Sequence, residues 1–117
     1  MNTSIKTQSF KDLVVWQKSK RLAVLIYKLT SNFPHSELYG LTNQMRRAAI
    51  SISSNIAESY HRIHEKEKRQ FLWIAFGSGS ELESQLEISK ELFPNLDYAE
   101  SFDLLMEVMK ILNSFLK

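Results

Sequence analysis

The sequence contains no cysteine, and its 117 residues include only two prolines and three glycines. Without cysteine, neither a disulfide framework nor a thiolate metal site can form. Sheet-rich folds need more turn residues than this chain provides, so the scarcity of proline and glycine favours long helices. The sequence also lacks a run of about 18 apolar residues, and we therefore expect no transmembrane helix.

The N-terminal stretch MNTSIKTQSFKDL lacks the apolar segment of a secretory signal. The absence of cysteine fits a reducing compartment, so we expect a cytoplasmic protein that does not associate with membranes. The rest of the composition, 44% hydrophobic and 24% charged residues, is that of an ordinary globular protein. A chain of this length is expected to form one domain over residues 1–117.

Apolar residues recur at helical spacing in four stretches that are separated by short breaks. This pattern predicts helices over residues 10–32, 37–60, 65–92 and 98–116. Short connections make neighbouring helices antiparallel, so the expected fold is an all-α, up-down-up-down four-helix bundle.

The third predicted helix contains the segment AFGSGSELESQ, which resembles a break. Ser80 and Glu83 have the spacing of a capping box, which is typical of a helix start. Apolar residues nevertheless continue in one register on both sides of the segment, and a break would normally reset that register. We therefore predict one continuous helix in which Gly77 and Gly79 allow close packing.

The charges are distributed unevenly along the chain. Residues 1–47 carry eight Lys/Arg and two Asp/Glu, whereas residues 81–117 carry three Lys/Arg and eight Asp/Glu. The basic front could bind an anionic partner such as RNA or DNA. Alternatively, the two regions could neutralise each other within one subunit or between subunits.

Two features predict self-association. The first helix carries Trp16 and Tyr27 on a second apolar face, outside the stripe that serves the core, and aromatic anchors are typical of protein interfaces. The second helix carries a polar row beside its apolar stripe, and we expect this row to bond across helices or subunits. The candidate interface residues are Trp16, Tyr27, Ser51, Asn55 and Glu58.

Three kinds of chemical site have weak support in the sequence. Glu58 and His61 have the spacing of one Glu-x-x-His metal motif, but a di-metal bundle needs a second copy, which is missing. The GSGS segment at residues 77–80 follows no strand and precedes no lysine, unlike a phosphate-binding loop. No Ser, His and Asp arrangement is suggested by local spacing. We therefore predict no enzymatic activity, no metal and no cofactor.

Basic residues that could neutralise phosphates are more numerous. The end of the second helix and the start of the third should meet at one tip of the bundle, with Trp73 nearby to stack on a base. The same EKEKR segment could instead be an ordinary solvated face. The candidate nucleic-acid-binding residues are Lys18, Lys20, Arg21, Arg46, Arg47, Arg62, Lys66, Lys68 and Arg69.

Three blocks of the sequence together carry a resemblance to a known family. They are FP-x-x-E-x-Y-G-L from Phe33, Q-x-R-R-A-A-x-S-I from Gln44, and S-N-I-A-E from Ser54. With their flanking segments, from Phe10 to about Leu92, they resemble the small bacterial four-helix-bundle proteins encoded by 23S rRNA intervening sequences, often described as ribosomal-protein-like. One departure is Ser59, where the family usually has glycine after S-N-I-A-E.

The resemblance implies a ring-like homopentamer of four-helix bundles without enzymatic activity. It also implies kinship with the accessory protein of diversity-generating retroelements, a basic barrel that binds nucleic acid and partners a reverse transcriptase. Two hypotheses follow. The protein is a non-enzymatic oligomer that binds structured RNA or another nucleic acid, or it is a protein-interaction scaffold that binds none.

Overall fold

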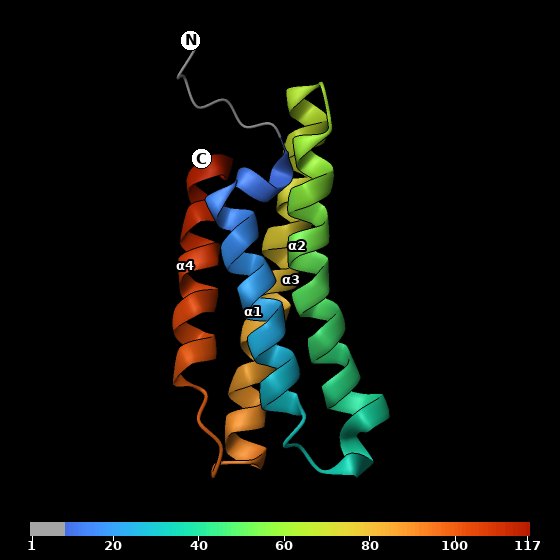
Figure 1. The fold of residues 1–117 in the computed structure, drawn as a ribbon, viewed down its shortest axis with the longest axis vertical. Coiled ribbons are helices and arrows are strands. Elements are labelled where there is room, and N and C mark those ends of the chain that lie inside the picture. Colours follow the sequence, from blue (N-terminus) through green and yellow to red (C-terminus); the bar gives the residue numbers. More distant parts are fainter. Residues whose placement is uncertain (1–8) are drawn as a thin grey trace.

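Four α-helices make up most of the computed structural model, which describes residues 9–117. They are α1 (Val14–Thr30), α2 (Asn43–Tyr60), α3 (Glu65–Leu92) and α4 (Ala99–Leu116). Figure 1 shows the four helices side by side, with α2 and α4 on opposite sides and α1 and α3 between them. The part of the chain that the structure describes contains no strand. The protein is therefore all-α, and its helices pack as a bundle.

Each helix packs against two neighbours: α1 against α2 and α4, and α3 against α2 and α4. The contacts join an early residue of one helix to a late residue of its neighbour. At the start of α2, Met45 Sδ accepts a hydrogen bond from Ser89 Oγ near the end of α3. Early in α1, Lys18 contacts Glu107 in the second half of α4. This arrangement places the α1–α2 connection and the α2–α3 connection at opposite ends of the bundle (Figure 1).

The apolar stripes of the four helices meet in one core, as the helical spacing predicts. The largest of the side chains that are completely buried are Leu22, Ile26, Met45, Ile52, Ile56, Leu82, Leu86, Leu105 and Leu112. Burying one side chain of this size stabilises a protein by roughly 1.5–3 kcal/mol relative to leaving it exposed. The apolar stripes therefore explain why the four helices pack together. The residues available for binding other molecules lie on the remaining, mostly polar faces.

The first helix begins later than residue 10, which the sequence analysis predicts as its start. Phe10–Asp12 form a short 3-10 helix instead, and Ser9 Oγ accepts a hydrogen bond from the Lys11 N–H at its start. Leu13 then has extended backbone angles, φ −73° and ψ 126°, so α1 begins at Val14. The break lets the Phe10 ring fold back onto Trp16, with the two ring centroids 5.0 Å apart.

The second helix also differs from the predicted range of 37–60. His35–Glu37 form a 3-10 turn, Leu38–Thr42 form a π-helical segment, and α2 itself begins at Asn43. Within the π-helical segment, Gly40 has the non-helical angles φ −112° and ψ −112°. The helical pattern of the sequence extends through this segment, but the backbone at Gly40 interrupts the regular α-helix.

The third helix runs without interruption through the GSGS segment, so the prediction of a continuous helix is confirmed. The two glycines have different surroundings. A Cβ at Gly79 would collide with Met109 Sδ of α4, so this glycine permits close approach of α3 and α4. A Cβ at Gly77 would meet nothing within 4 Å. Close packing inside the subunit therefore explains Gly79 and does not explain Gly77.

Candidate nucleic-acid interface

The two adjacent arginines of α2 lie in different environments. Arg46 Nε donates a hydrogen bond to Thr30 Oγ1 at 2.9 Å, and Arg46 Nη2 donates to the Tyr27 carbonyl at 3.4 Å. Its guanidinium also lies 4.6 Å from the centre of the Tyr27 ring. These contacts join Arg46 to the last turn of α1, whose Tyr27 carbonyl also accepts a hydrogen bond from the Ser31 N–H. The Arg46 side chain holds α1 against α2.

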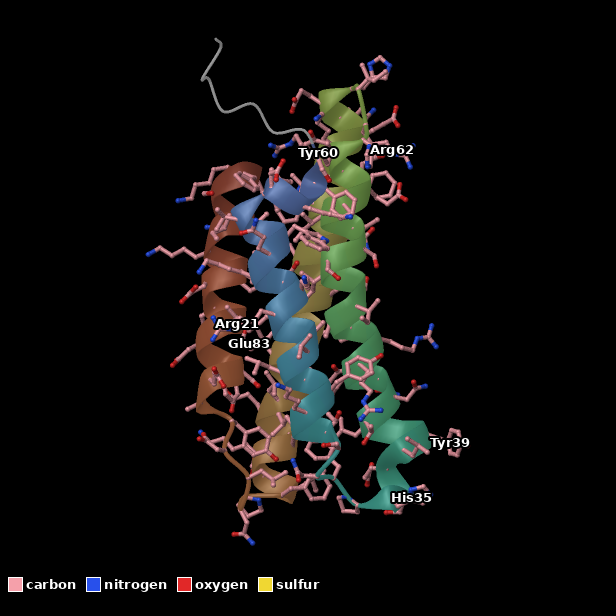
Figure 2. All side chains as sticks on the ribbon, in the orientation of Figure 1. Arg21, His35, Tyr39, Tyr60, Arg62 and Glu83 are labelled. Atoms are coloured by element: carbon pink, nitrogen blue, oxygen red, sulfur yellow. The ribbon has the colours of Figure 1, made fainter. Side chains whose placement is uncertain are left out.

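Arg47 points away from these contacts. Its side chain is exposed and makes no hydrogen bond or ion pair within residues 9–117. It lines an open hollow together with Tyr39, Asn43, Gln44 and Glu81. Tyr39 is 91% exposed, and Figure 2 shows its side chain projecting from the bundle near the end where α1 connects to α2. Arg47 therefore keeps a full, accessible charge beside an exposed aromatic ring.

The predicted basic tip, where α2 connects to α3, is less available than its sequence indicates. Arg62 Nη2 pairs with Glu58 Oε2 at 2.6 Å, and its guanidinium lies 4.7 Å from the centre of the Phe71 ring. Arg69 donates to the carbonyls of Phe115 and Leu116 at 3.3 and 2.8 Å. Both arginines thus serve contacts inside the subunit. Lys66 is exposed and Lys68 is half-buried, and neither has an ion pair among the described residues.

Ion pairs with α4 neutralise part of the basic charge of α1. Lys18 Nζ lies 2.6 Å from Glu107 Oε2, and Arg21 Nη2 lies 3.4 Å from Glu100 Oε2. The hydrogen bond from Lys18 and its positive charge lower the pKa of Glu107. Lys20 instead lies 5.6 Å from the centre of the Trp16 ring. The basic front and the acidic back of the chain therefore neutralise each other within the subunit at Lys18 and Arg21.

The polar row of α2 forms part of the seam with α3. Ser51 Oγ and Ser78 Oγ are 2.8 Å apart, so this row bonds between helices as the sequence predicts. Asn55 Nδ2 donates to the Ser51 carbonyl at 2.8 Å and to Ser51 Oγ at 3.1 Å. Among the candidate interface residues, Ser51, Asn55 and Glu58 are thus engaged inside the subunit, and Tyr27 is 44% exposed.

Comparison with known proteins places this architecture in a family. The family model of the 23S rRNA-intervening sequence protein matches residues 11–115. The chain belongs to this family. No curated protein matches the chain. A solved structure from Bacteroides thetaiotaomicron, described as a protein of unknown function from the S23 ribosomal protein family, is similar to it. Its sequence is 28% identical to this one, and the two structures superpose with a TM-score of 0.79. The match covers 89% of this chain and 99% of the other.

The two residues of the Glu58-x-x-His61 motif make other contacts in the structure. Glu58 pairs with Arg62, and the His61 ring packs edge-on against Phe10 and Tyr60, with centroids 5.9 and 5.3 Å away. Residues 9–117 contain no group of three or more His, Asp or Glu side chains that could hold a metal ion. Within the same residues, no helix is both long enough and apolar enough to cross a membrane.

Tyr98 is a structural polar residue that the sequence analysis did not single out. Its hydroxyl oxygen lies 3.0 and 2.9 Å from the carbonyl oxygens of Ser89 and Phe93, where α3 ends before α4, so its single proton is shared between the two acceptors. Burial raises the pKa of Tyr98. The sequence did offer a signal for this role, because the tyrosine follows the FPNLD turn and lies one residue before α4. The buried Tyr98 hydroxyl thus connects the start of α4 to the end of α3.

Proposed function

We propose that this intervening-sequence protein is a non-enzymatic protein that binds nucleic acid, and structured RNA in particular. The observation that carries the proposal is Arg47. It is exposed and has no partner within residues 9–117, whereas the other arginines of the chain bond to groups of their own subunit. An arginine without an acidic partner keeps its attraction for phosphate and releases counterions when it binds. Lys20, Lys66 and Lys68 add exposed or half-exposed positive charge.

The test is the affinity for a fluorescent RNA hairpin, measured by anisotropy across a salt series. Wild-type affinity should fall steeply as salt rises. Arg47→Gln should weaken binding and reduce the slope of log affinity against log salt by roughly 0.7–0.9 if one phosphate contact is lost. Lys110→Gln is the matched control, because Lys110 is exposed on acidic α4 and the charge change is the same. Equal effects of the two variants, or wild-type binding that ignores salt, would contradict the proposal.

The proposal includes the assembly. We expect an up-down-up-down subunit that forms a ring-like homopentamer, as the family resemblance implies, and a ring would repeat Arg47 on every subunit and increase avidity. Half-exposed apolar side chains on the outer side of α3 support contact with a second copy: Trp73, Ile74 and Ile88. Charge complementarity supports it too. The stretch from Ser78 to the end of α3 carries four acidic residues and one lysine, whereas α1 carries no acidic residue and keeps Lys20 and Lys28 outside its ion pairs with α4.

Gly77 offers a test of self-association that does not endanger folding. Glycine inside a helix costs about 1 kcal/mol relative to alanine, and nothing inside the subunit lies near a Cβ at this position. Gly77→Leu should therefore leave the subunit at least as stable while blocking the approach of a second copy. Sedimentation velocity should show a lower mass for this variant, and Ser114→Leu on the exposed side of α4 is the control. A wild-type monomer would refute the assembly.

A protein-interaction scaffold is the second candidate function. The ion pairs of Lys18 and Arg21 with α4 favour it, because they remove basic charge from α1. A reverse transcriptase is a proposed partner in either case, by the likeness to the accessory protein of diversity-generating retroelements. Copurification of a stable protein partner after RNase treatment, together with no RNA affinity, would favour the scaffold.

A further inference from the structure

The hollow beside Arg47 has a composition that suits one particular ligand. It lies where the π-helical segment Leu38–Thr42 leads into α2, with α3 on its other side. None of its five lining side chains makes a hydrogen bond, an ion pair or a ring contact within residues 9–117. The lining residues are Tyr39, Asn43, Gln44, Arg47 and Glu81.

Tyr39 presents its ring to solvent. The side chain is 91% exposed, so it adds almost nothing to the core of the subunit. The non-helical backbone of the next residue, Gly40, interrupts the helix at this point, and Figure 2 shows Tyr39 projecting outward. A free aromatic face is a stacking platform for a nucleobase, because every base has a flat π surface.

Two of the other lining residues share one side of α2. Asn43 and Arg47 are four residues apart in that helix, and Tyr39 lines the same hollow from before the kink at Gly40. The amides of Asn43 and Gln44 offer donors and acceptors suited to a base edge. The Arg47 guanidinium suits a phosphate. Glu81 of α3 repels a second phosphate, which restricts the anion to the Arg47 side.

We propose that this hollow is a subsite for one unpaired nucleotide of an RNA chain. The base stacks on Tyr39, its edge meets the amides of Asn43 and Gln44, and its phosphate binds Arg47. A base inside a duplex is stacked on its neighbours and cannot reach the ring, so the subsite recognises loops, bulges and single strands. This inference rests on the proposed binding of nucleic acid and adds which part of the RNA is bound.

The test compares two RNA ligands with equal numbers of phosphates, a single strand and a blunt-ended duplex, in anisotropy titrations of the full chain. Tyr39→Ala should weaken binding of the single strand about fivefold or more, the range typical of losing one stacked base, and change duplex binding less than twofold. Tyr39→Phe should retain wild-type affinity. Phe115→Ala is the control, because Phe115 is also half-exposed and aromatic but lies in α4, outside the hollow.

The outcomes separate this inference from the proposal on which it rests. If the wild-type protein binds neither RNA, both are wrong. If it binds RNA in a salt-dependent way but Tyr39→Ala binds both ligands like wild type, the nucleotide subsite is wrong and general RNA binding stands. If Tyr39→Ala lost affinity for a copurifying protein while its RNA affinity stayed unchanged, the hollow would be a peptide-docking surface and the nucleotide subsite would be wrong. Because Tyr39 packs on nothing inside the subunit, its variants should remain folded, which circular dichroism checks.

Discussion

The two ends of the bundle both carry clustered arginines, yet they use them differently. At the end where α2 connects to α3, Arg62 pairs with Glu58 and Arg69 bonds to the last carbonyls of α4. At the end where α1 connects to α2, Arg46 bonds to the last turn of α1, while its neighbour Arg47 has no partner within the described residues. The density of basic residues in the sequence therefore does not identify the surface that can bind an anion.

The difference follows from helix ends. Each helix leaves carbonyls without a partner in its last turn, and these carbonyls attract a cation. Arg69 binds two such carbonyls at the end of α4, whereas Arg46 binds the Thr30 hydroxyl and the Tyr27 carbonyl in the last turn of α1. An arginine held in this way has fewer donors free for phosphate. The α1–α2 end retains Arg47 because only one of its two adjacent arginines can reach the end of α1.

The largest effect on stability is expected from Arg69→Met. The variant loses two hydrogen bonds from a charged donor to the end of α4, and we expect the free energy of unfolding to fall by about 1–3 kcal/mol. Urea denaturation measures this change. Lys66→Met, at the same end, is the control and should stay within about 0.5 kcal/mol of wild type. If both variants behaved alike, Arg69 would be an ordinary surface cation and the contrast between the ends would weaken.

The adjacent arginines of α2 give the next largest effect. Arg46→Met removes the bonds to Thr30 and Tyr27 and should lower the free energy of unfolding by about 1–2 kcal/mol. Arg47→Met should change it by less than about 0.5 kcal/mol, because no internal contact is lost. Thermal and urea unfolding of the two single variants make a matched pair. Equal destabilisation would mean that Arg47 also has a structural role.

The smallest effect is expected from the Lys18–Glu107 pair, which lies between the two ends. The pKa of the Glu107 carboxyl is lowered in the folded state. Any stability that the pair contributes is therefore present at pH values above the ordinary pKa of 4.5 and is lost as the pH falls through the folded-state pKa. Both side chains are substantially exposed to solvent, and such pairs contribute little. Glu107→Gln should therefore shift the melting temperature slightly at neutral pH and not at all in acid. A shift that grew in acid would contradict this account.

Helical spacing predicted the core, because the side chains that bury together are determined mainly by their own periodicity. It also predicted the uninterrupted α3 and a polar row on α2 that bonds across helices or subunits, which the Ser51–Ser78 bond makes specific to α3. It missed the break at Leu13 and the π-helical segment, since backbone geometry there depends on tertiary contacts such as the packing of Phe10 on Trp16. The partners of Arg46 and Arg69 could not be predicted, because they are the Thr30 hydroxyl and carbonyls of other helices, whose ends meet the arginines only in the folded bundle.

The most direct test of the proposed nucleic-acid surface is ultraviolet crosslinking of the wild-type protein to single-stranded RNA, followed by mass spectrometry of the crosslinked peptides. The α1–α2 end should dominate, with crosslinks at Tyr39 that disappear in the presence of excess unlabelled RNA. Crosslinks confined to the segment of residues 66–73, including Trp73, would contradict the account and would return the binding surface to the basic tip at the α2–α3 end.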